Sequence, residues 1–539
     1  MNTVYERFHQ SAQRWAETEF LHVEPVTAKA YGIEARSYTW SQALNEVQRL
    51  RAAYIEAGYG HGHRVGLMLE NRPVYFFHWL ALNSLGVSVV PMSVEMRSAE
   101  LEYLIGHSEI ALAVVLPQRT DLITQAAETA GIPTRVTDAA ATAFPTPAHP
   151  APHAHAPERA TECALLYTSG TTGRPKGCRL TNDYFLHTGD WYTSLGGHCP
   201  VRPGMERIMT PLPLNHVNAM CFSAMAVITA GGCIIQIDRF HPKTWWDSVR
   251  TAGATIVHYL GVMPAMLLSA TPAESDTQHA VRWGFGAGVG AADHSVFEAR
   301  FGFPLVEGWA MTETGAGAAI HASQGTRHIG THYIGQPSSE VQVRVVAEDG
   351  SEAQAGETGE LLVRASGSDP RRHFFNGYLK DEVATEEAWA GGWFHTGDVV
   401  RRDEHGGLYF VDRKKNVIRR SGENISAVEV ESVLNKHPAV KTTAVAATPD
   451  PVRGDEVLAC VVTQEPVPQE QREAIAASIV QWSLERLAYY KAPGYVAFVN
   501  ALPVTSSQKI QRGELKTLAA QLPGQGHCID TRHLKNRRP

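Results

Sequence analysis

The most informative segment of the chain is Leu165-Leu-Tyr-Thr-Ser-Gly-Thr-Thr-Gly-Arg-Pro-Lys-Gly177. Its apolar start is typical of a buried strand, and six consecutive Gly, Ser or Thr residues follow, from Thr168 to Gly173. Small residues let the backbone turn tightly and direct N–H and hydroxyl donors at a phosphate, and Lys176 adds positive charge. The segment therefore predicts a phosphate-binding loop after a strand, although Pro175 excludes the Walker A pattern.

Strand-like and helix-like stretches alternate on both sides of this loop. Residues 41–57 have the spacing of an amphipathic helix, and a strand (64–70), a helix (74–86) and a second strand (87–93) follow. The alternation resumes at residue 163 and continues to about residue 306. Such alternation is typical of βαβ units and predicts an α/β fold with a mainly parallel sheet.

The pattern changes twice toward the C-terminus. Residues 336–411 are rich in strand-like runs and Gly-Glu turns, which predicts a small β-rich subdomain. Beyond them, Ser426 and Glu429 form a capping box that opens a helix ending near residue 437, and strands and a helix at 475–488 follow. We expect a large N-terminal domain at residues 1–414 and a small, mobile α+β domain at residues 415–539.

Composition limits the class of protein. The 539 residues carry 48 Lys and Arg against 55 Asp and Glu, a net charge of −7, with 44% hydrophobic and 19% charged residues. These values are typical of a soluble globular protein and argue against a nucleic-acid partner, which would need a basic excess. Seven cysteines, an odd number without a CxxC pair, argue against a zinc cluster and against a disulfide framework, so we predict a reducing, cytoplasmic location.

Three stretches allow more than one interpretation. The apolar run 219–235 is short for a membrane span and contains Gly231-Gly232, so we expect a buried helix running into a strand and no integral span. The Pro- and His-rich segment 142–158 favours a solvated loop over a metal site at His149, His153 and His155. The basic tail 530–539 is expected to be disordered.

Two further segments carry groups suited to a nucleotide. Residues 306–317 present Trp309, Thr312 and Glu313 after a strand; an aromatic ring can stack on a base, and a carboxylate can hold Mg²⁺ beside phosphates. Asp398 lies in a Thr-Gly-Asp turn, where one carboxylate can accept bonds from two ribose hydroxyls. Arg413 opens a basic run that a solvated face or a nuclear signal would also explain.

A competing motif lies in the middle of the chain. Gly286-Ala-Gly-Val-Gly-Ala291 matches the GxGxxG/A dinucleotide fingerprint, between a strand-like and a helix-like stretch and with Glu307 downstream. This pattern supports a nicotinamide- or flavin-dependent oxidoreductase as an alternative. It would leave the phosphate loop at Thr168 to Lys176 unexplained.

Taken together, these segments resemble the acyl-adenylate-forming superfamily of acyl-CoA synthetases, peptide-synthetase adenylation domains and luciferases. The matching motifs are YTSGTTGRPKG, AMTETG, HTGD, DRKKNVI and a late lysine, and they span residues 165–516. The segments RRSGENIS and PLPLNHVNA look most like those of crotonobetaine/carnitine-CoA ligases and related acyl-CoA ligases. Trp309 replaces the family's usual tyrosine, and Gln508 replaces the glycine before the late lysine.

The resemblance implies a role for each matching residue. The phosphate loop would bind the ATP phosphates, Glu313 would hold Mg²⁺, and Lys509 would place positive charge where negative charge gathers in the transition state. A rotation at Lys415 would then exchange Lys509 for a CoA-binding segment. The implied residues are catalytic Lys509, Thr312, Glu313 and His216; ATP/AMP-binding Thr168, Ser169, Gly170, Thr171, Thr172, Gly173, Lys176, Gly286, Ala287, Gly288, Trp309, Ala310, Met311, Asp398 and Arg413; hinge Lys415; and CoA-binding Arg419, Ser421, Gly422 and Glu423.

The resemblance also implies the reaction. We expect an enzyme that uses ATP and Mg²⁺ to convert a carboxylic acid to acyl-AMP and then transfers the acyl group to coenzyme A. The alternatives are transfer to a carrier protein or an amine, the oxidoreductase above, and a non-catalytic homologue. The sequence does not identify the carboxylic acid. It allows a homodimer but does not determine the oligomeric state.

Overall fold

Helix α3 (Trp40–Ala57) begins close to where the sequence pattern predicts a helix. The computed structural model describes residues 1–168, 175–414, 416–420, 423–450, 453–487, 489–504 and 510–535. Helix α3 begins one residue before the expected helix, because the Thr39 hydroxyl accepts from Gln42 N and the Gln42 side chain accepts from Thr39 N. Gly58 in the left-handed conformation ends the helix.

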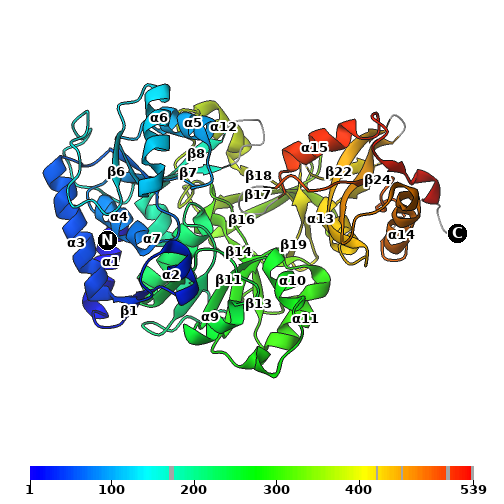
Figure 1. Cartoon of the computed structure of the whole chain (residues 1–539), viewed down its shortest axis with the longest axis horizontal. Helices are drawn as coiled ribbons and strands as arrows, with labels where there is room; N and C mark the ends of the chain where they lie inside the picture. The colour runs from blue at the N-terminus through cyan, green and yellow to red at the C-terminus, as the bar shows by residue number, and fades with distance from the viewer. Residues whose placement is uncertain are drawn as a thin grey trace. The chain divides into compact units, whose positions relative to one another are not determined.

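One sheet in the N-terminal part carries the predicted phosphate loop. Its strand order is β6-β5-β3-β4-β7-β8, parallel except for the β7–β8 pair. Helices α5 and α6 pack together beside it (Figure 1) and bury Leu104 and Ile123 against Met68 and Val90. The elements are β3 (Arg64–Met68), α4 (Pro73–Asn83), β4 (Ser88–Pro91), α5 (Ser98–Ser108), β5 (Leu112–Val115), α6 (Thr120–Ala130), β6 (Arg135–Asp138), β7 (Glu162–Thr168) and β8 (Lys176–Thr181).

A second sheet has the order β14-β13-β12-β11-β9-β10-β1-β2, with antiparallel pairs only at its two ends. Its elements are α1 (Val4–Arg14), β1 (Glu19–His22), α2 (Pro25–Tyr31), β2 (Ser37–Thr39), α7 (Asn182–Thr193), β9 (Arg207–Thr210), β10 (Cys233–Gln236), α9 (Trp245–Thr251), β11 (Ile256–Leu260), α10 (Val262–Leu268), β12 (Trp283–Ala287), α11 (Ala291–Phe301), β13 (Leu305–Trp309) and β14 (Ile320–His321). The two sheets confirm the predicted α/β class.

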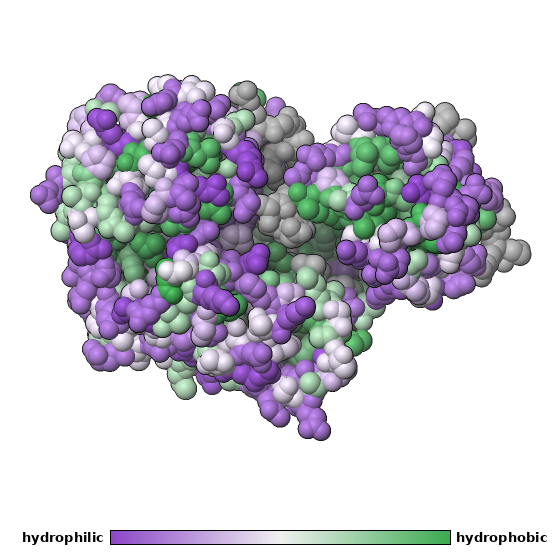
Figure 2. Space-filling view, in the orientation of Figure 1, coloured by the Kyte–Doolittle hydropathy of each residue, from purple (hydrophilic) through white to green (hydrophobic). Residues whose placement is uncertain are grey.

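The apolar run 219–235 is a buried helix that leads into a strand, as expected. A π-helical segment (Asn218–Ser223) continues into α8 (Ala224–Ala230), and β10 begins at Cys233. Among the described residues, no helix is long and apolar enough to cross a membrane. On the face that Figure 2 shows, hydrophilic residues dominate and hydrophobic residues form small groups.

The strand-rich stretch forms a sheet of its own, with the order β15-β19-β18-β17-β16. Its strands are β15 (Tyr333–Gly335), β16 (Val341–Val346), β17 (Thr358–Ala365), β18 (Phe394–Arg402) and β19 (Leu408–Arg413). Helix α12 (Glu382–Ala388), which the sequence pattern does not predict, lies between β17 and β18 along the chain and begins where the Asp381 side chain accepts from Ala384 N.

The last sheet has the order β21-β20-β23-β24-β25, and β22 pairs with β23. Ser426 caps α13 by accepting from Glu429 N, but the helix ends at Leu434, before the expected His437. The expected helix 475–488 runs earlier, as α14 (Arg472–Leu484). The remaining elements are β20 (Ile418–Arg420), β21 (Glu423–Ile425), α13 (Ala427–Leu434), β22 (Val440–Asp450), β23 (Gly454–Thr463), β24 (Tyr495–Phe498), α15 (Arg512–Gln521) and β25 (Ile529–Asp530).

The expectation of a disordered basic tail is wrong for residues 530–535, and residues 536–539 lie outside the described residues. Strand β25 pairs with β24, and Thr531 Oγ1 donates to Pro493 O. The Lys535 side chain is fully buried, with Nζ 2.6 Å from Glu456 Oε1. Burial and the neighbouring arginines lower the Lys535 pKa to about 8 in spite of Glu456. A basic residue is therefore ordered here by a buried carboxylate that sequence spacing cannot reveal.

The chain divides into two compact units. One comprises residues 1–344, 362–396 and 406–408, and the other residues 345–361, 397–405 and 409–539. In the second unit, Ile418, Val430, Val457 and Ile479 belong to one buried core. The mobile domain expected at residues 415–539 remains a prediction, because it concerns movement of one part against another.

Candidate active site

The two ends of the predicted phosphate loop lie opposite each other. Thr168 is the last residue of β7, Lys176 is the first of β8, and the two are paired in the antiparallel register. Lys176 Nζ lies 4.8 Å from the ring centroid of Tyr378. The loop residues Ser169, Gly170, Thr171, Thr172 and Gly173 lie outside the described residues.

Glu313 presents a buried carboxylate in the same region. Its exposed fraction is 7%, Tyr378 Oη donates to its Oε1 at 2.9 Å, and Phe375 N donates to its carbonyl oxygen at 2.9 Å. The preceding Thr312 is half-buried, and its carbonyl accepts from Tyr184 Oη at 3.0 Å. Tyr378 therefore contacts both the predicted metal ligand and the predicted phosphate-binding lysine.

The predicted adenine-lining residues are brought together by neighbouring parallel strands. Gly286 of β12 lies in register with Glu307 of β13, so residues 286–288 and 309–311 follow from adjacent strand ends. Ala287, Gly288 and Ala310 are exposed, Met311 is half-buried and Trp309 is buried. Any side chain at Gly286 would meet the Tyr259 carbonyl oxygen at 2.3 Å, which explains the glycine.

The Glu307 carboxylate accepts hydrogen bonds from the backbone of the turn that follows β12. Its Oε2 accepts from Gly288 N at 2.8 Å and its Oε1 accepts from Val289 N at 3.0 Å. Tyr259 Oη lies 3.3 Å from Oε1. Burial raises the pKa of Glu307 although these donors oppose the shift. The carboxylate that the dinucleotide fingerprint would use for a ribose is thus occupied by the backbone of its own turn.

Other predicted residues are placed separately. His216 is exposed, just before the π-helical segment, and its carbonyl accepts from Met220 N. In the second unit, Arg413 Nε forms an ion pair with Asp398 Oδ1 at 2.7 Å, so the two predicted ribose-binding residues are neighbours. Arg419 lies on β20 and Glu423 on β21, whereas Lys415, Ser421, Gly422 and Lys509 lie outside the described residues.

Sequence analysis does not single out Tyr378. It lies in Phe374-Phe-Asn-Gly-Tyr378, where a glycine with φ +79° precedes the tyrosine, but the motif carries no charged or nucleophilic group. Its importance appears only through the contact with Glu313, which is 65 residues away in sequence.

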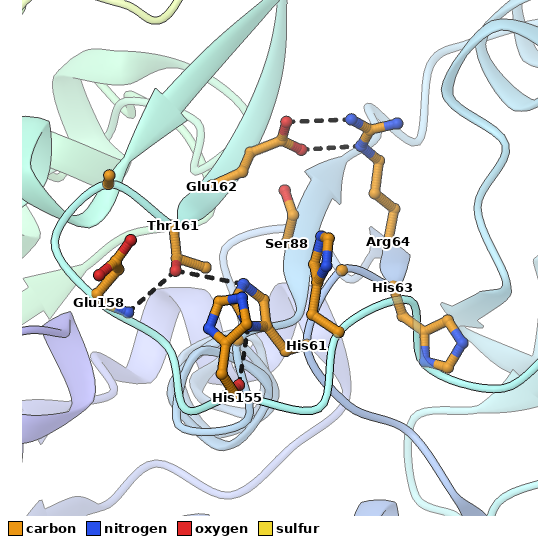
Figure 3. A pocket seen from close by; sticks show the side chains of 12 residues that line it. His61, His63, Arg64, Ser88, His155, Glu158, Thr161 and Glu162 are labelled. Atoms are coloured by element: carbon orange, nitrogen blue, oxygen red, sulfur yellow. Dashed lines mark hydrogen bonds and ion pairs between the residues drawn. The ribbon is translucent and has the colours of Figure 1, made fainter.

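The His-rich loop lies over a separate cavity of about 290 Å³ (Figure 3). His63 Nε2 lies 3.0 Å from His149 O, and His61 Nδ1 lies 3.0 Å from His155 O, so histidines bind the loop through its carbonyls. His149, His153 and His155 are exposed. Within the described part of the chain, no three His, Cys, Asp or Glu side chains are placed to hold a metal. The exposure of these three histidines agrees with a solvated loop.

Comparisons with known proteins identify the family of the chain. Residues 8–379 match the family model for AMP-binding enzymes, and residues 429–509 match the model for their C-terminal domain. The sulfoacetate–CoA ligase of Cupriavidus necator is 31% identical over 484 residues, which cover 88% of this chain and 92% of that protein. The crotonobetaine/carnitine–CoA ligase of Shigella flexneri is 28% identical over 510 residues, covering 92% and 96%.

Solved structures show the same fold. ATP-bound MatB from Rhodopseudomonas palustris superposes with a TM-score of 0.78 at 24% identity, covering 96% of this chain and 99% of that chain. The anthranilate CoA ligase AuaEII in complex with anthranoyl-AMP gives a TM-score of 0.80 at 21% identity, covering 97% and 98%. The predicted resemblance is confirmed, and the oxidoreductase alternative has no support. The chain belongs to the family of AMP-binding enzymes.

Proposed function

We propose that this chain is an ATP-dependent acyl-CoA ligase, which forms an acyl-AMP and then an acyl-CoA thioester. Family membership and the CoA ligases among its relatives support this activity. The structural observation that carries the proposal is the meeting of Lys176 and Glu313 at Tyr378. A lysine at the end of the phosphate loop and a buried carboxylate both contact the same tyrosine. This pair of groups suits a nucleoside triphosphate with its metal ion.

In the first half-reaction, a carboxylate oxygen of the acid attacks the α-phosphorus of ATP. A new O–P bond forms, the bond to the bridging oxygen breaks, and pyrophosphate leaves with the electron pair. Residues 168–173 and Lys176 would bind the β- and γ-phosphates, and residues 286–288 and 309–311 would line the adenine. Lys509 would contact the acid and the α-phosphate and stabilise the charge of the transition state.

The donor set fits Mg²⁺. Glu313 is a carboxylate with one oxygen bonded to Tyr378, and Mg²⁺ in nucleotide sites is held by one or two carboxylates together with substrate phosphates and water. Bound there, the ion would neutralise negative charge on the departing pyrophosphate. Thr312 and Glu313 would hold the phosphate side of the nucleotide in place.

In the second half-reaction, the CoA sulfur attacks the acyl carbonyl and AMP leaves. We propose that residues 415–539 act as a mobile domain hinged at Lys415, which withdraws Lys509 and brings residues 419–423 to the CoA. Asp398 and Arg413 would bind the ribose, and His216 would lie near the substrate carboxylate. The Asp398–Arg413 ion pair supports a shared role for these two residues.

The acid is not named by these features. The relatives act on sulfoacetate and on crotonobetaine or carnitine, which are small charged acids, and we propose this class for the first assays. Trp245 and Trp246 do not form a box for a trimethylammonium group, because Trp245 is buried and Trp246 stacks on Phe301 at 4.4 Å. All seven cysteines are free thiols, which supports a cytoplasmic setting.

The test is pyrophosphate release with Mg-ATP across a panel of acids, each with and without CoA. The panel contains sulfoacetate, crotonobetaine, carnitine, acetate to palmitate, benzoate and dicarboxylates. We expect one acid to give release that rises strongly with CoA, together with a thioester product. A rate of pyrophosphate release that does not depend on CoA would favour transfer to a carrier protein or an amine. No release with any acid would contradict the proposed ligase activity.

A further inference from the structure

The segment that contains Tyr378 is fixed along β8, directly after the predicted phosphate loop. Asn376 N donates to Arg179 O at 2.7 Å, Arg179 N donates to Gly377 O at 3.1 Å, and Leu379 N donates to Gly177 O at 2.8 Å. Tyr378 thereby lies opposite Cys178 in a bridge between the two backbones. The backbone of Tyr378 is thus tied to the strand that begins with Lys176.

Helix α12 fixes the same residue from the other side. Tyr378 N donates to Thr385 Oγ1 at 2.9 Å, and that hydroxyl in turn donates to Asp381 O at 2.9 Å. Phe375 packs edge-on against the Tyr378 ring, with centroids 4.8 Å apart. These contacts support the ring where it lies, and 7% of the residue is exposed.

From this position the side chain meets two groups of opposite charge. Its hydroxyl donates to Glu313 Oε1, and its ring face lies beneath Lys176 Nζ. A phenol hydroxyl is an uncharged hydrogen-bond donor near neutral pH. A neutral donor orients a carboxylate without adding charge, and an aromatic face attracts an ammonium group without neutralising it.

We propose that Tyr378 is a positioning residue, which sets the distance between the phosphate-binding Lys176 and the metal-binding Glu313. This inference rests on the proposed function. The hydroxyl holds the Glu313 carboxylate toward the metal, and the ring holds the Lys176 ammonium toward the phosphates. Loss of the hydroxyl alone should therefore weaken the metal contribution, whereas loss of the whole ring should weaken metal and nucleotide together.

The two roles separate in two variants. Tyr378→Phe removes the hydrogen bond to Glu313 and keeps the ring beneath Lys176, and Tyr378→Leu removes both. Tyr54→Phe is the matched control, because Tyr54 is fully buried, its hydroxyl bonds His78 Nδ1 at 2.7 Å, and it lies far from Glu313 in the sequence, on α3. All three proteins are compared by thermal unfolding before use.

The measurement is ATP affinity by calorimetry with and without Mg²⁺, in the absence of any acid. In the native protein we expect Mg²⁺ to tighten ATP binding. In Tyr378→Phe that gain should fall about tenfold, as when a partner that orients a metal ligand is removed, while affinity without Mg²⁺ stays within about twofold. Tyr378→Leu should also lose affinity without Mg²⁺, and Tyr54→Phe should lose neither.

The outcomes separate the two proposals. If the native protein binds no ATP, the proposed function fails. If it binds ATP with a gain from Mg²⁺ and Tyr378→Phe keeps that gain, the positioning role is wrong while the ligase stands. An equal loss in Tyr54→Phe would likewise overturn the inference, because it would show a general effect of losing a buried hydroxyl.

Discussion

Two buried glutamates, Glu307 within β13 and Glu313 shortly after its end, have different partners. Glu307 accepts from Gly288 N and Val289 N and is 5% exposed, and Glu313 accepts from the Tyr378 hydroxyl and is 7% exposed. Exposure does not distinguish them, but their donors do. The backbone of the adjacent turn binds both oxygens of Glu307, and Tyr259 Oη adds a third donor, whereas a side chain that also touches Lys176 binds Glu313.

This difference shows how a buried carboxylate is assigned a role. A carboxylate that satisfies backbone donors of its own fold stabilises that fold, and its removal leaves N–H groups without a partner. A carboxylate oriented by a side chain, next to a cation that binds phosphate, is arranged for a ligand. We therefore assign Glu307 to the shape of the 286–289 turn and propose Glu313 for the chemistry.

The largest effect is expected from Glu313→Gln. The amide keeps the size of the side chain and an oxygen for Tyr378, but it lacks the charge that would hold Mg²⁺. The rate of acyl-AMP formation should fall by about 10²-fold or more, the magnitude found when a group that stabilises transition-state charge is lost. Pyrophosphate release at saturating Mg²⁺ measures this effect, and thermal unfolding should show little change. A rate within threefold of the native one would contradict the proposed role of Glu313.

A smaller effect on rate and a larger one on stability are expected from Glu307→Gln. One amide oxygen can serve only part of the turn, and the amide NH₂ then faces a backbone N–H. The free energy of unfolding should fall by about 1–3 kcal/mol, the cost of leaving a buried donor unsatisfied. Urea unfolding measures this loss, and the rate at saturating ATP should fall far less than in Glu313→Gln. Equal stability of the two variants would erase the distinction between the glutamates.

Part of this comparison is visible in the sequence. The strand and small-residue loop at 165–177 predict the β7–β8 arrangement, and Met311-Thr-Glu313 marks a carboxylate after a strand. Both signals are local, because each depends on residues close together in the chain. The same local rule favours Glu307 as a ribose ligand in a dinucleotide motif, and the hydrogen bonds to Gly288 and Val289 show why it is not one.

The remainder depends on contacts between distant residues. Tyr378 meets Glu313 because residues 376–379 pair with β8, a register that no spacing in the sequence specifies. The prediction of a disordered tail is wrong for the same reason, because Lys535 is ordered by Glu456 on another strand. Helix α12 is also not predicted, because its sequence Glu382-Val-Ala-Thr-Glu-Glu-Ala388 is short and lacks a clear apolar stripe.

The smallest effect concerns pH. The pKa of Glu307 is raised in the folded protein above its ordinary value of 4.5, so the folded state holds the proton more tightly than the unfolded state. The resulting stability is fully present below pH 4.5 and is lost as pH rises through the raised pKa. The melting temperature of the native protein minus that of Glu307→Gln should therefore increase as pH falls from 7 toward 4.5. A difference that stays constant or decreases would contradict the assigned environment of Glu307.

The Lys509→Ala variant separates the two half-reactions. One preparation is assayed for acyl-AMP formation from acid and Mg-ATP, and for thioester formation from synthetic acyl-AMP and CoA. We expect the first reaction to be abolished and the second to stay within about twofold of the native rate, because Lys509 acts only on the adenylating transition state. Loss of both reactions, or retention of both, would contradict this role of Lys509.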